Sequence, residues 1–120
     1  YDGVHLLLRY RNAQELYAIS MQRRDGKVAI KRKTPGGPSN GGSYTELAEA
    51  EFPWQRDWVT VDATVQDADD GTTRLALNLD GRQIISATDS SADRLTGAGA
   101  VGLRGDNAEF YFKNLVAENS

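Results

Sequence analysis

Hydrophobic and polar residues alternate with a period of two along most of the 120-residue chain. This alternation is typical of β-strands that place one face on a core, and turn-forming residues separate the alternating segments. No segment keeps the apolar spacing of a helix for three turns, and only Ser91–Leu95 is expected to form a short helical turn. We therefore predict nine strands, at His5–Tyr10, Glu15–Arg23, Lys27–Lys33, Tyr44–Glu49, Trp58–Gln66, Thr73–Leu79, Arg82–Thr88, Ala100–Arg104 and Glu109–Ala117.

The segment Leu75–Asp89 reads LALNLDGRQIISATD and predicts a β-hairpin. Asp80 and Gly81 would form its two-residue turn, since glycine tolerates a positive φ and aspartate is well suited to the turn. One face of the hairpin is then mostly apolar, as expected for a sheet that covers a core. The pairs predicted on that face are Leu79 with Arg82, Leu77 with Ile84, and Leu75 with Ser86.

Short strands with turn signals between them indicate an antiparallel sandwich or barrel. The chain has the length of one domain and contains no internal repeat, so residues 1–120 are expected to form a single all-β domain. No apolar run approaches the roughly 20 residues that a membrane-spanning helix needs. Cysteine is absent, which excludes disulfides and thiolate metal sites but leaves the cellular compartment open.

The net charge of −3 is distributed unevenly along the chain. Residues 1–34 carry eight Lys or Arg against three Asp or Glu, whereas residues 35–120 carry six against fourteen. A basic segment can indicate an anionic partner. We favour the simpler interpretation, in which these charges line the solvent side of strands and turns. Aromatic residues do not stand at the spacing of a nucleic-acid-binding module, so nucleic acid is not an expected partner.

Two motifs that resemble ligand-binding loops have simpler interpretations. GAGAVG, residues Gly97–Gly102, has the glycine spacing of a dinucleotide-binding loop, but a turn and a strand follow it where that site needs a helix. We expect its glycines to allow close backbone approach where a strand begins. DADDG, residues Asp67–Gly71, clusters carboxylates that suit calcium, but its spacing is not that of an EF-hand and we favour an acidic hairpin loop. We expect no cofactor, and no motif supports a structural calcium site.

The inventory of catalytic residues is small. His5 is the only histidine, which excludes a metal cluster built on several histidines. Glutamates could supply the carboxylate pair of a glycoside hydrolase. However, the Glu-x-Asp-x-x-Glu strand pattern of laminarinase-type sandwich hydrolases is missing, and we favour solvated side chains. These glutamates are Glu46, Glu49, Glu51 and Glu109.

Alternation also places polar and aromatic side chains on shared faces. In GVHLLLRY, Arg9 would lie on the same face as His5, and in AEFYFKNLV, Tyr111 shares a face with Lys113. If these strands lie in one sheet, Arg9, Tyr111 and Lys113 would form one concave surface with the ring and charged groups that sugar recognition needs. Trp54 follows a proline in a loop and would offer a platform for a sugar ring. An ordinary solvated face is the open alternative.

Four stretches carry a resemblance to a known superfamily: WVTVDATV, LALNLDGRQIISATD, LTGAGAVGLR and AEFYFKNLV. In this order they resemble the second half of the concanavalin A-like lectin/glucanase domains. Within that superfamily the chain is similar to the jelly-roll modules attached to secreted bacterial polysaccharide lyases and glycoside hydrolases. The front of the chain reads DGVHLLLRYRNAQELYAISMQRRDGKVAIKRK. It resembles a pair of strands in these modules, the first with a glycine, apolar residues and Arg-Tyr, and the second with a tyrosine.

This resemblance implies two curved antiparallel sheets, with ligands in the groove of the concave sheet. It implies that Arg9 is a groove residue and extends the same expectation to Tyr111. Lys113 stands where members commonly have an aspartate that can serve a structural calcium, so calcium is not expected there. Catalytic members carry an acid/base strand, whereas YAISMQRR offers only Gln22, which argues against catalysis. Such domains have one or more strands before the Arg-Tyr strand, so we expect the N-terminal part of the domain to be incomplete.

We therefore expect a non-catalytic carbohydrate-binding module of a secreted multimodular enzyme. It would bind a poly- or oligosaccharide in a concave-sheet groove, beside a neighbouring catalytic domain, with no membrane partner. A glycoside hydrolase or polysaccharide lyase of the same fold is the main alternative, and a laminin-G-like protein-interaction domain is the third. The residues expected to contact saccharide are Arg9, Trp54, Tyr111 and Lys113.

Overall fold

The computed structural model describes residues 3–39, 41–53, 59–97 and 99–106, and the regular structure in them is β-strand throughout. The strands are β1 (Gly3–Asn12), β2 (Glu15–Met21), β3 (Lys27–Ser39), β4 (Gly42–Glu51), β5 (Val61–Asp67), β6 (Thr73–Leu79), β7 (Arg82–Asp89) and β8 (Ala100–Asp106). The predicted strand Glu109–Ala117 lies outside the described residues. This part of the chain contains no helix long and apolar enough to cross a membrane.

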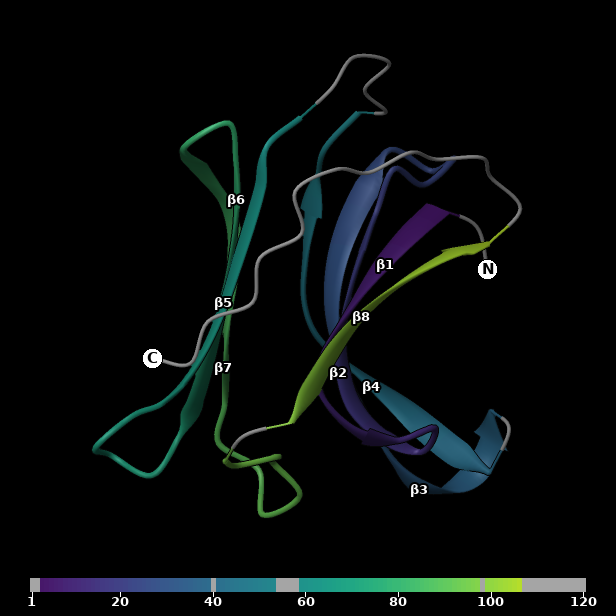
Figure 1. Cartoon of the computed structure of the whole chain (residues 1–120), viewed down its shortest axis with the longest axis vertical. Coiled ribbons are helices and arrows are strands. Elements are labelled where there is room, and N and C mark those ends of the chain that lie inside the picture. Colours follow the sequence, from purple (N-terminus) through teal and green to yellow (C-terminus); the bar gives the residue numbers. More distant parts are fainter. Residues whose placement is uncertain (1–2, 40, 54–58, 98, 107–120) are drawn as a thin grey trace.

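The strands form two antiparallel sheets that lie face to face (Figure 1). One sheet has five strands in the order β4-β3-β2-β1-β8, and the other has three in the order β5-β6-β7. The predicted all-β sandwich of two antiparallel sheets is thereby confirmed. Its jelly-roll connectivity stays a prediction.

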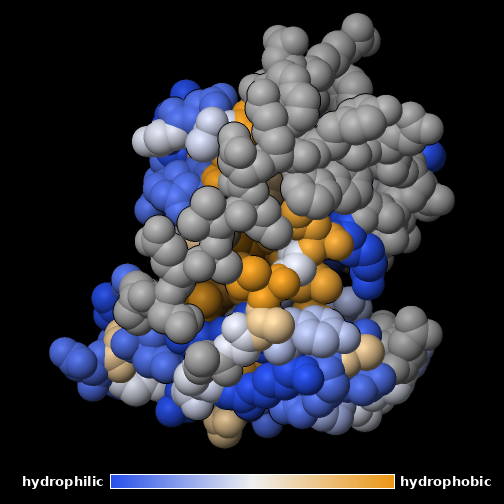
Figure 2. All heavy atoms as spheres, in the orientation of Figure 1, coloured by the Kyte–Doolittle hydropathy of each residue, from blue (hydrophilic) through white to orange (hydrophobic). Residues whose placement is uncertain are grey.

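The core lies between the sheets and follows from the period-two pattern. On β2, Tyr17 and Ile19 are fully buried, and on β6, Leu75 and Leu77 oppose them from the other sheet. Full burial of one such aliphatic side chain contributes about 1.5–3 kcal/mol to folding. Figure 2 shows hydrophobic residues gathered in the middle of the visible face, with hydrophilic residues around them. The alternating apolar residues of these strands thus form one shared core.

The five-stranded sheet is strongly curved, and its concave side faces away from the three-stranded sheet (Figure 1). Its convex side carries the core residues. Successive side chains of a strand point to opposite faces of the sheet. The residues that alternate with Tyr17 and Ile19 on β2, or with Val28 and Ile30 on β3, therefore lie on the concave side.

The structure differs from the sequence prediction in the extent of one strand and in the register of one hairpin. The stretch TPGGPSNGGS, predicted as a loop, continues β3 as far as Ser39 before the chain turns into β4. In the β6–β7 hairpin, Leu79 pairs with Arg82 as predicted, but a bulge beyond this pair shifts Leu77 to face Ile85. Residues Ser91–Leu95 form the single short turn that was expected, with the Arg94 N–H donating to the Ser91 carbonyl three residues earlier.

Candidate functional site

Three of the four residues predicted to bind saccharide lie outside the described residues: Trp54, Tyr111 and Lys113. The fourth, Arg9, lies between the two sheets and not beside His5 on the concave side. Its backbone has a φ of 48°, and the β1–β2 register is interrupted between Leu8 and Asn12. A bulge of this kind breaks strict alternation, so the face predicted for Arg9 was wrong. Its role in binding stays a prediction.

Arg9 connects the two sheets through its guanidinium group. Its Nη1 atom donates to the Asp67 carboxylate at the end of β5, at 2.5 Å, and to the Leu95 carbonyl at 2.8 Å. The hydrogen bond from Arg9, together with one from the Gly97 N–H, holds the pKa of Asp67 below its ordinary value. Because only 8% of Arg9 is exposed, its guanidinium contributes to the packing of the sheets.

The concave face of the five-stranded sheet is the surface that the predicted fold assigns to ligands. Its floor is small and apolar where Leu7 of β1 lies between Ala18 of β2 and Gly102 of β8. An apolar floor beside polar groups suits the C–H face of a sugar ring. The side chains that alternation and strand pairing place on this concave face are His5, Leu7, Leu16, Ala18, Ser20, Ala29, Lys31, Lys33, Tyr44, Glu46, Glu49 and Arg104.

Two lysines and one tyrosine form a compact group on the β3–β4 side of this face, which we call the Lys–Tyr cluster. The Nζ atom of Lys33 lies 5.2 Å from the centroid of the Tyr44 ring, and that of Lys31 lies 5.9 Å from it. Each ammonium is within reach of a cation–π attraction, which contributes about 0.5–1 kcal/mol at exposed sites and more where water is excluded. Tyr44 is half-buried and therefore keeps part of its ring accessible.

Both lysines of the cluster are nearly inaccessible, with 5% of each residue exposed. Lysine is rarely buried to this extent without compensation, because its ammonium group is strongly hydrated. Lys31 lies opposite Glu46 across the β3–β4 ladder, whereas Lys33 lies opposite Tyr44. The cluster therefore concentrates two positive charges on a concave surface, with an aromatic ring beside them.

The β1–β8 side of the face carries a histidine and an arginine. His5 Nδ1 lies 2.7 Å from the Ser20 hydroxyl, and both residues are almost completely buried. Arg104 is the neighbour of His5 on β8 and is exposed. Hydrogen-bonding groups therefore stand on both sides of the apolar floor.

The edge of the concave face at β4 is acidic. The Lys27 ammonium lies 3.2 Å from the Glu49 carboxylate. The hydrogen bond between these two groups lowers the pKa of Glu49 and raises that of Lys27, so both are charged at neutral pH. Glu46 is exposed on the same strand. These carboxylates belong to the glutamates considered above as candidates for hydrolysis.

The sequence already contained a signal for the Lys–Tyr cluster. Lys31 and Lys33 stand two residues apart on one predicted strand, and Tyr44 and Glu46 stand two apart on the next. Period-two spacing puts each pair on one face, but the relative register of the two strands depends on the intervening turn. Because that stretch was predicted as a loop, the sequence could not indicate that Lys33 faces Tyr44.

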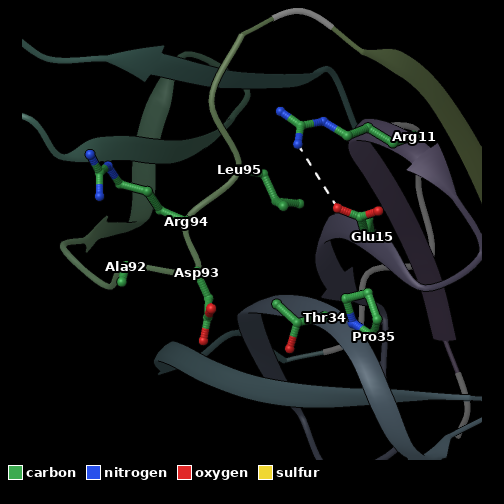
Figure 3. Close-up of a pocket in the computed structure, with 8 residues that line it drawn as sticks. All are labelled: Arg11, Glu15, Thr34, Pro35, Ala92, Asp93, Arg94 and Leu95. Carbon is green, nitrogen blue, oxygen red and sulfur yellow. Dashed lines mark ion pairs between the residues drawn. The ribbon is translucent and has the colours of Figure 1, made fainter.

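A separate polar cleft of about 290 Å³ opens at one end of the sandwich (Figure 3). Arg11 and Glu15 line one side, and the segment after β7, with Arg94, lines another. Arg11 is 3.9 Å from Glu15 and donates to the Thr96 carbonyl, and Arg94 donates to the Ser91 carbonyl. Both arginines of this cleft and Glu15 are thus engaged with the protein itself, which makes it a weaker candidate than the concave face.

The acidic motif Asp67–Gly71 forms the loop of the β5–β6 hairpin, as favoured from the sequence. Asp67 pairs with Arg9, and Asp70 accepts hydrogen bonds from Thr72 and Arg74. In the parts of the chain that the structure describes, no three His, Cys, Asp or Glu side chains are close enough to hold a metal ion.

Comparison with protein-family models, with curated proteins and with solved structures finds no match for this chain. The candidate site is therefore defined by its own geometry.

Proposed function

We propose that this domain is a non-catalytic carbohydrate-binding module that holds a poly- or oligosaccharide on its concave face. The observation that carries the proposal is the Lys–Tyr cluster beside the apolar floor around Leu7. Sugar binding combines an aromatic ring and apolar surface for C–H faces with charged donors for hydroxyl or carboxylate groups. The concave face offers these groups within one curved sheet.

The sequence resemblance described above supports the same proposal. It carries the expectation that the protein is secreted and works beside a catalytic domain. Trp54, Tyr111 and Lys113 remain proposed saccharide contacts from the sequence. Arg9 is the exception among the predicted contacts, because its guanidinium is bound to Asp67 and Leu95.

A glycoside hydrolase or polysaccharide lyase is the competing proposal, and one observation favours it. Glu46 and Glu49 place two carboxylates on the concave face, where an acid and a base of hydrolysis would stand. However, the Lys27 ammonium holds the pKa of Glu49 below its ordinary value, which is opposite to the shift that a general acid needs. This electrostatic setting is our reason for preferring binding over catalysis.

A glycan array followed by calorimetry tests the proposal, with variants at Tyr44. Tyr44→Ala removes the ring and is expected to weaken saccharide binding about 10-fold, whereas Tyr44→Phe keeps the ring and is expected to bind within a few-fold of the original protein. Reducing-end and unsaturated-product assays on the bound glycans are expected to detect no turnover. If turnover is detected and disappears in Glu46→Gln or Glu49→Gln, the protein is a hydrolase or lyase and the binding-module proposal is wrong. If no glycan on the array binds, both the binding module and the enzyme are rejected, and the laminin-G-like protein-interaction domain is the remaining alternative.

A further inference from the structure

We infer that the saccharide bound on the concave face is acidic, and that the Lys33 ammonium binds the carboxylate of one of its uronate residues. The inference rests on the proposed function and adds the class of ligand and the residue that selects it. The lysines and arginines of residues 1–34 differ in whether they have an acidic partner in the structure.

Lys33 combines deep burial with the lack of an acidic partner. Only 5% of the residue is exposed, yet no carboxylate of the described residues lies within ion-pair distance of its ammonium. Its ammonium lies instead over the Tyr44 ring, 5.2 Å from the centroid. The 5% exposure describes the whole residue, and Lys33 Nζ is not among the fully buried polar atoms that lack a partner. Even so, an ammonium on a side chain this shielded loses part of its hydration, and a ring compensates for that loss less fully than a carboxylate does. An anionic ligand group would supply the missing charge.

The other two lysines of β3 each have a glutamate of β4 nearby. Lys27 forms an ion pair with Glu49 on β4, and Lys31 lies opposite Glu46. Lys33 occupies the equivalent position two residues further along, but there the β4 residue is Tyr44. Strand β4 thus pairs Lys27 with a carboxylate and places Glu46 opposite Lys31, whereas Lys33, on the concave side, has Tyr44 opposite it.

Four of the five arginines in residues 1–34 form ion pairs with acidic residues of the protein. Ion pairs join Arg9 to Asp67, Arg11 to Glu15, Arg23 to Asp25, and Arg32 to Asp89. Much of the excess positive charge in residues 1–34 is therefore neutralised within the protein. The sequence left open whether this segment signals an anionic partner or only a solvated face, and Lys33 gives the first alternative a specific location.

The surrounding residues hold the Lys33 side chain in place. A Cβ atom added at Gly42 would stand 2.6 Å from the Lys33 Cε atom, so the stem lies against the backbone of the β3–β4 hairpin. On the opposite side, Leu16 of β2 is the ladder neighbour of Lys33. A stem confined in this way loses little further freedom when its ammonium binds a ligand, which favours binding.

The test uses a panel of uronate oligosaccharides, each paired with its carboxyl-reduced neutral counterpart, together with sulfated oligosaccharides. Calorimetry at low and high salt measures each affinity. We expect at least one uronate oligosaccharide to bind about 10- to 100-fold more tightly than its neutral counterpart, as for other contacts with a charged partner. This preference should shrink as salt rises, because screening weakens the attraction between the charges.

Two variants assign the preference to Lys33. Lys33→Gln removes the charge and should abolish the preference for the uronate form. Gly42→Ala keeps the charge but displaces the stem, and should reduce the preference without abolishing it. Lys27→Gln is the matched control, since the same change is made to a lysine of the same strand that is already paired with Glu49. Melting curves confirm that each variant is folded at the temperature of the binding measurement.

Each result has a defined meaning. Equal binding of uronate and neutral forms would overturn the inference and leave the proposed function standing. Selective binding of sulfated oligosaccharides would overturn the assignment of a carboxylate. An equal loss in Lys33→Gln and Lys27→Gln would show a general effect of charge and overturn the role of Lys33. If no saccharide binds, the proposed function fails together with the inference.

Discussion

Arg32 and Asp89 form an ion pair between the two sheets, with 2.7 Å between the guanidinium Nη1 and the carboxylate Oδ1. Both side chains are buried, and Asp89 also accepts a hydrogen bond from Tyr17 at 2.8 Å. Burial and the hydrogen bond to Asp89 raise the pKa of Tyr17 to about 12, so the phenol stays a donor. These three side chains and the Arg9–Asp67 pair give the interface between the sheets its polar contacts.

Asp89→Asn tests how strongly the fold depends on this pair. The substitution keeps the shape of the side chain but leaves the Arg32 charge buried without a counter-charge. We expect it to lower the free energy of unfolding by about 3–5 kcal/mol, as when one partner of a buried pair is removed. Urea denaturation measures the change. Replacing both residues together, as Arg32→Met with Asp89→Leu, should recover much of the loss, and a single-variant loss below about 1 kcal/mol would contradict the assigned role.

The stability of the protein should fall on acidification through Asp89. Burial raises the pKa of this carboxyl, but hydrogen bonds from Arg32, Tyr17 and the Ser91 N–H outweigh it and hold the pKa below its ordinary value. A carboxyl with a lowered pKa in the folded state contributes stability above its unfolded pKa of about 3.9, and this contribution is lost as the pH falls through the folded pKa. Urea midpoints measured from pH 6 to pH 2.5 should therefore decrease below about pH 4. Asp89→Asn should show a smaller decrease, and a parallel decrease would assign the effect to other carboxyls.

Arg9→Met separates a packing role from a binding role at the residue predicted to contact sugar. Because the guanidinium is bound to Asp67 and Leu95 between the sheets, we expect a loss of about 1.5–3 kcal/mol in the free energy of unfolding. Saccharide affinity, measured well below the melting temperature, should stay within about twofold, a change of less than 0.5 kcal/mol. If a folded Arg9→Met variant binds saccharide much more weakly, Arg9 contacts the saccharide, as the sequence predicted.

The sequence predicted the elements of the fold better than their registers. Alternation located all eight described strands, and it gave the limits of Thr73–Leu79 without error. The turn at Asp80 and Gly81 is also present, with the predicted pair Leu79 and Arg82 next to it. The next pair, Asn78 with Gln83, keeps the same register. Beyond it the predicted register is wrong by one residue, because Ile84 forms a bulge that a period-two pattern does not show.

The candidate site was predicted only as a surface. The residues on this surface depend on features that alternation cannot supply. A bulge after Leu8 turns Arg9 to the inner side, and the length of β3 decides that Lys33 meets Tyr44. Both are consequences of backbone geometry at one or two residues, which neighbouring strands determine through packing and hydrogen bonds.

The glycine motif Gly97–Gly102 gives the last prediction, since the structure separates the roles of two of its glycines. A Cβ atom at Gly99 would stand 2.6 Å from the carbonyl carbon of Arg9, so β8 begins in close contact with the β1 backbone, as the sequence indicated. A Cβ atom at Gly102 would meet the Leu7 side chain at an ordinary 3.8 Å. Gly99→Ala is therefore expected to lower the free energy of unfolding by about 1–3 kcal/mol, because one of the two backbones must shift. Gly102→Ala, its matched control, should change it by less than about 0.5 kcal/mol in thermal or urea denaturation, and equal effects of the two substitutions would refute the close approach.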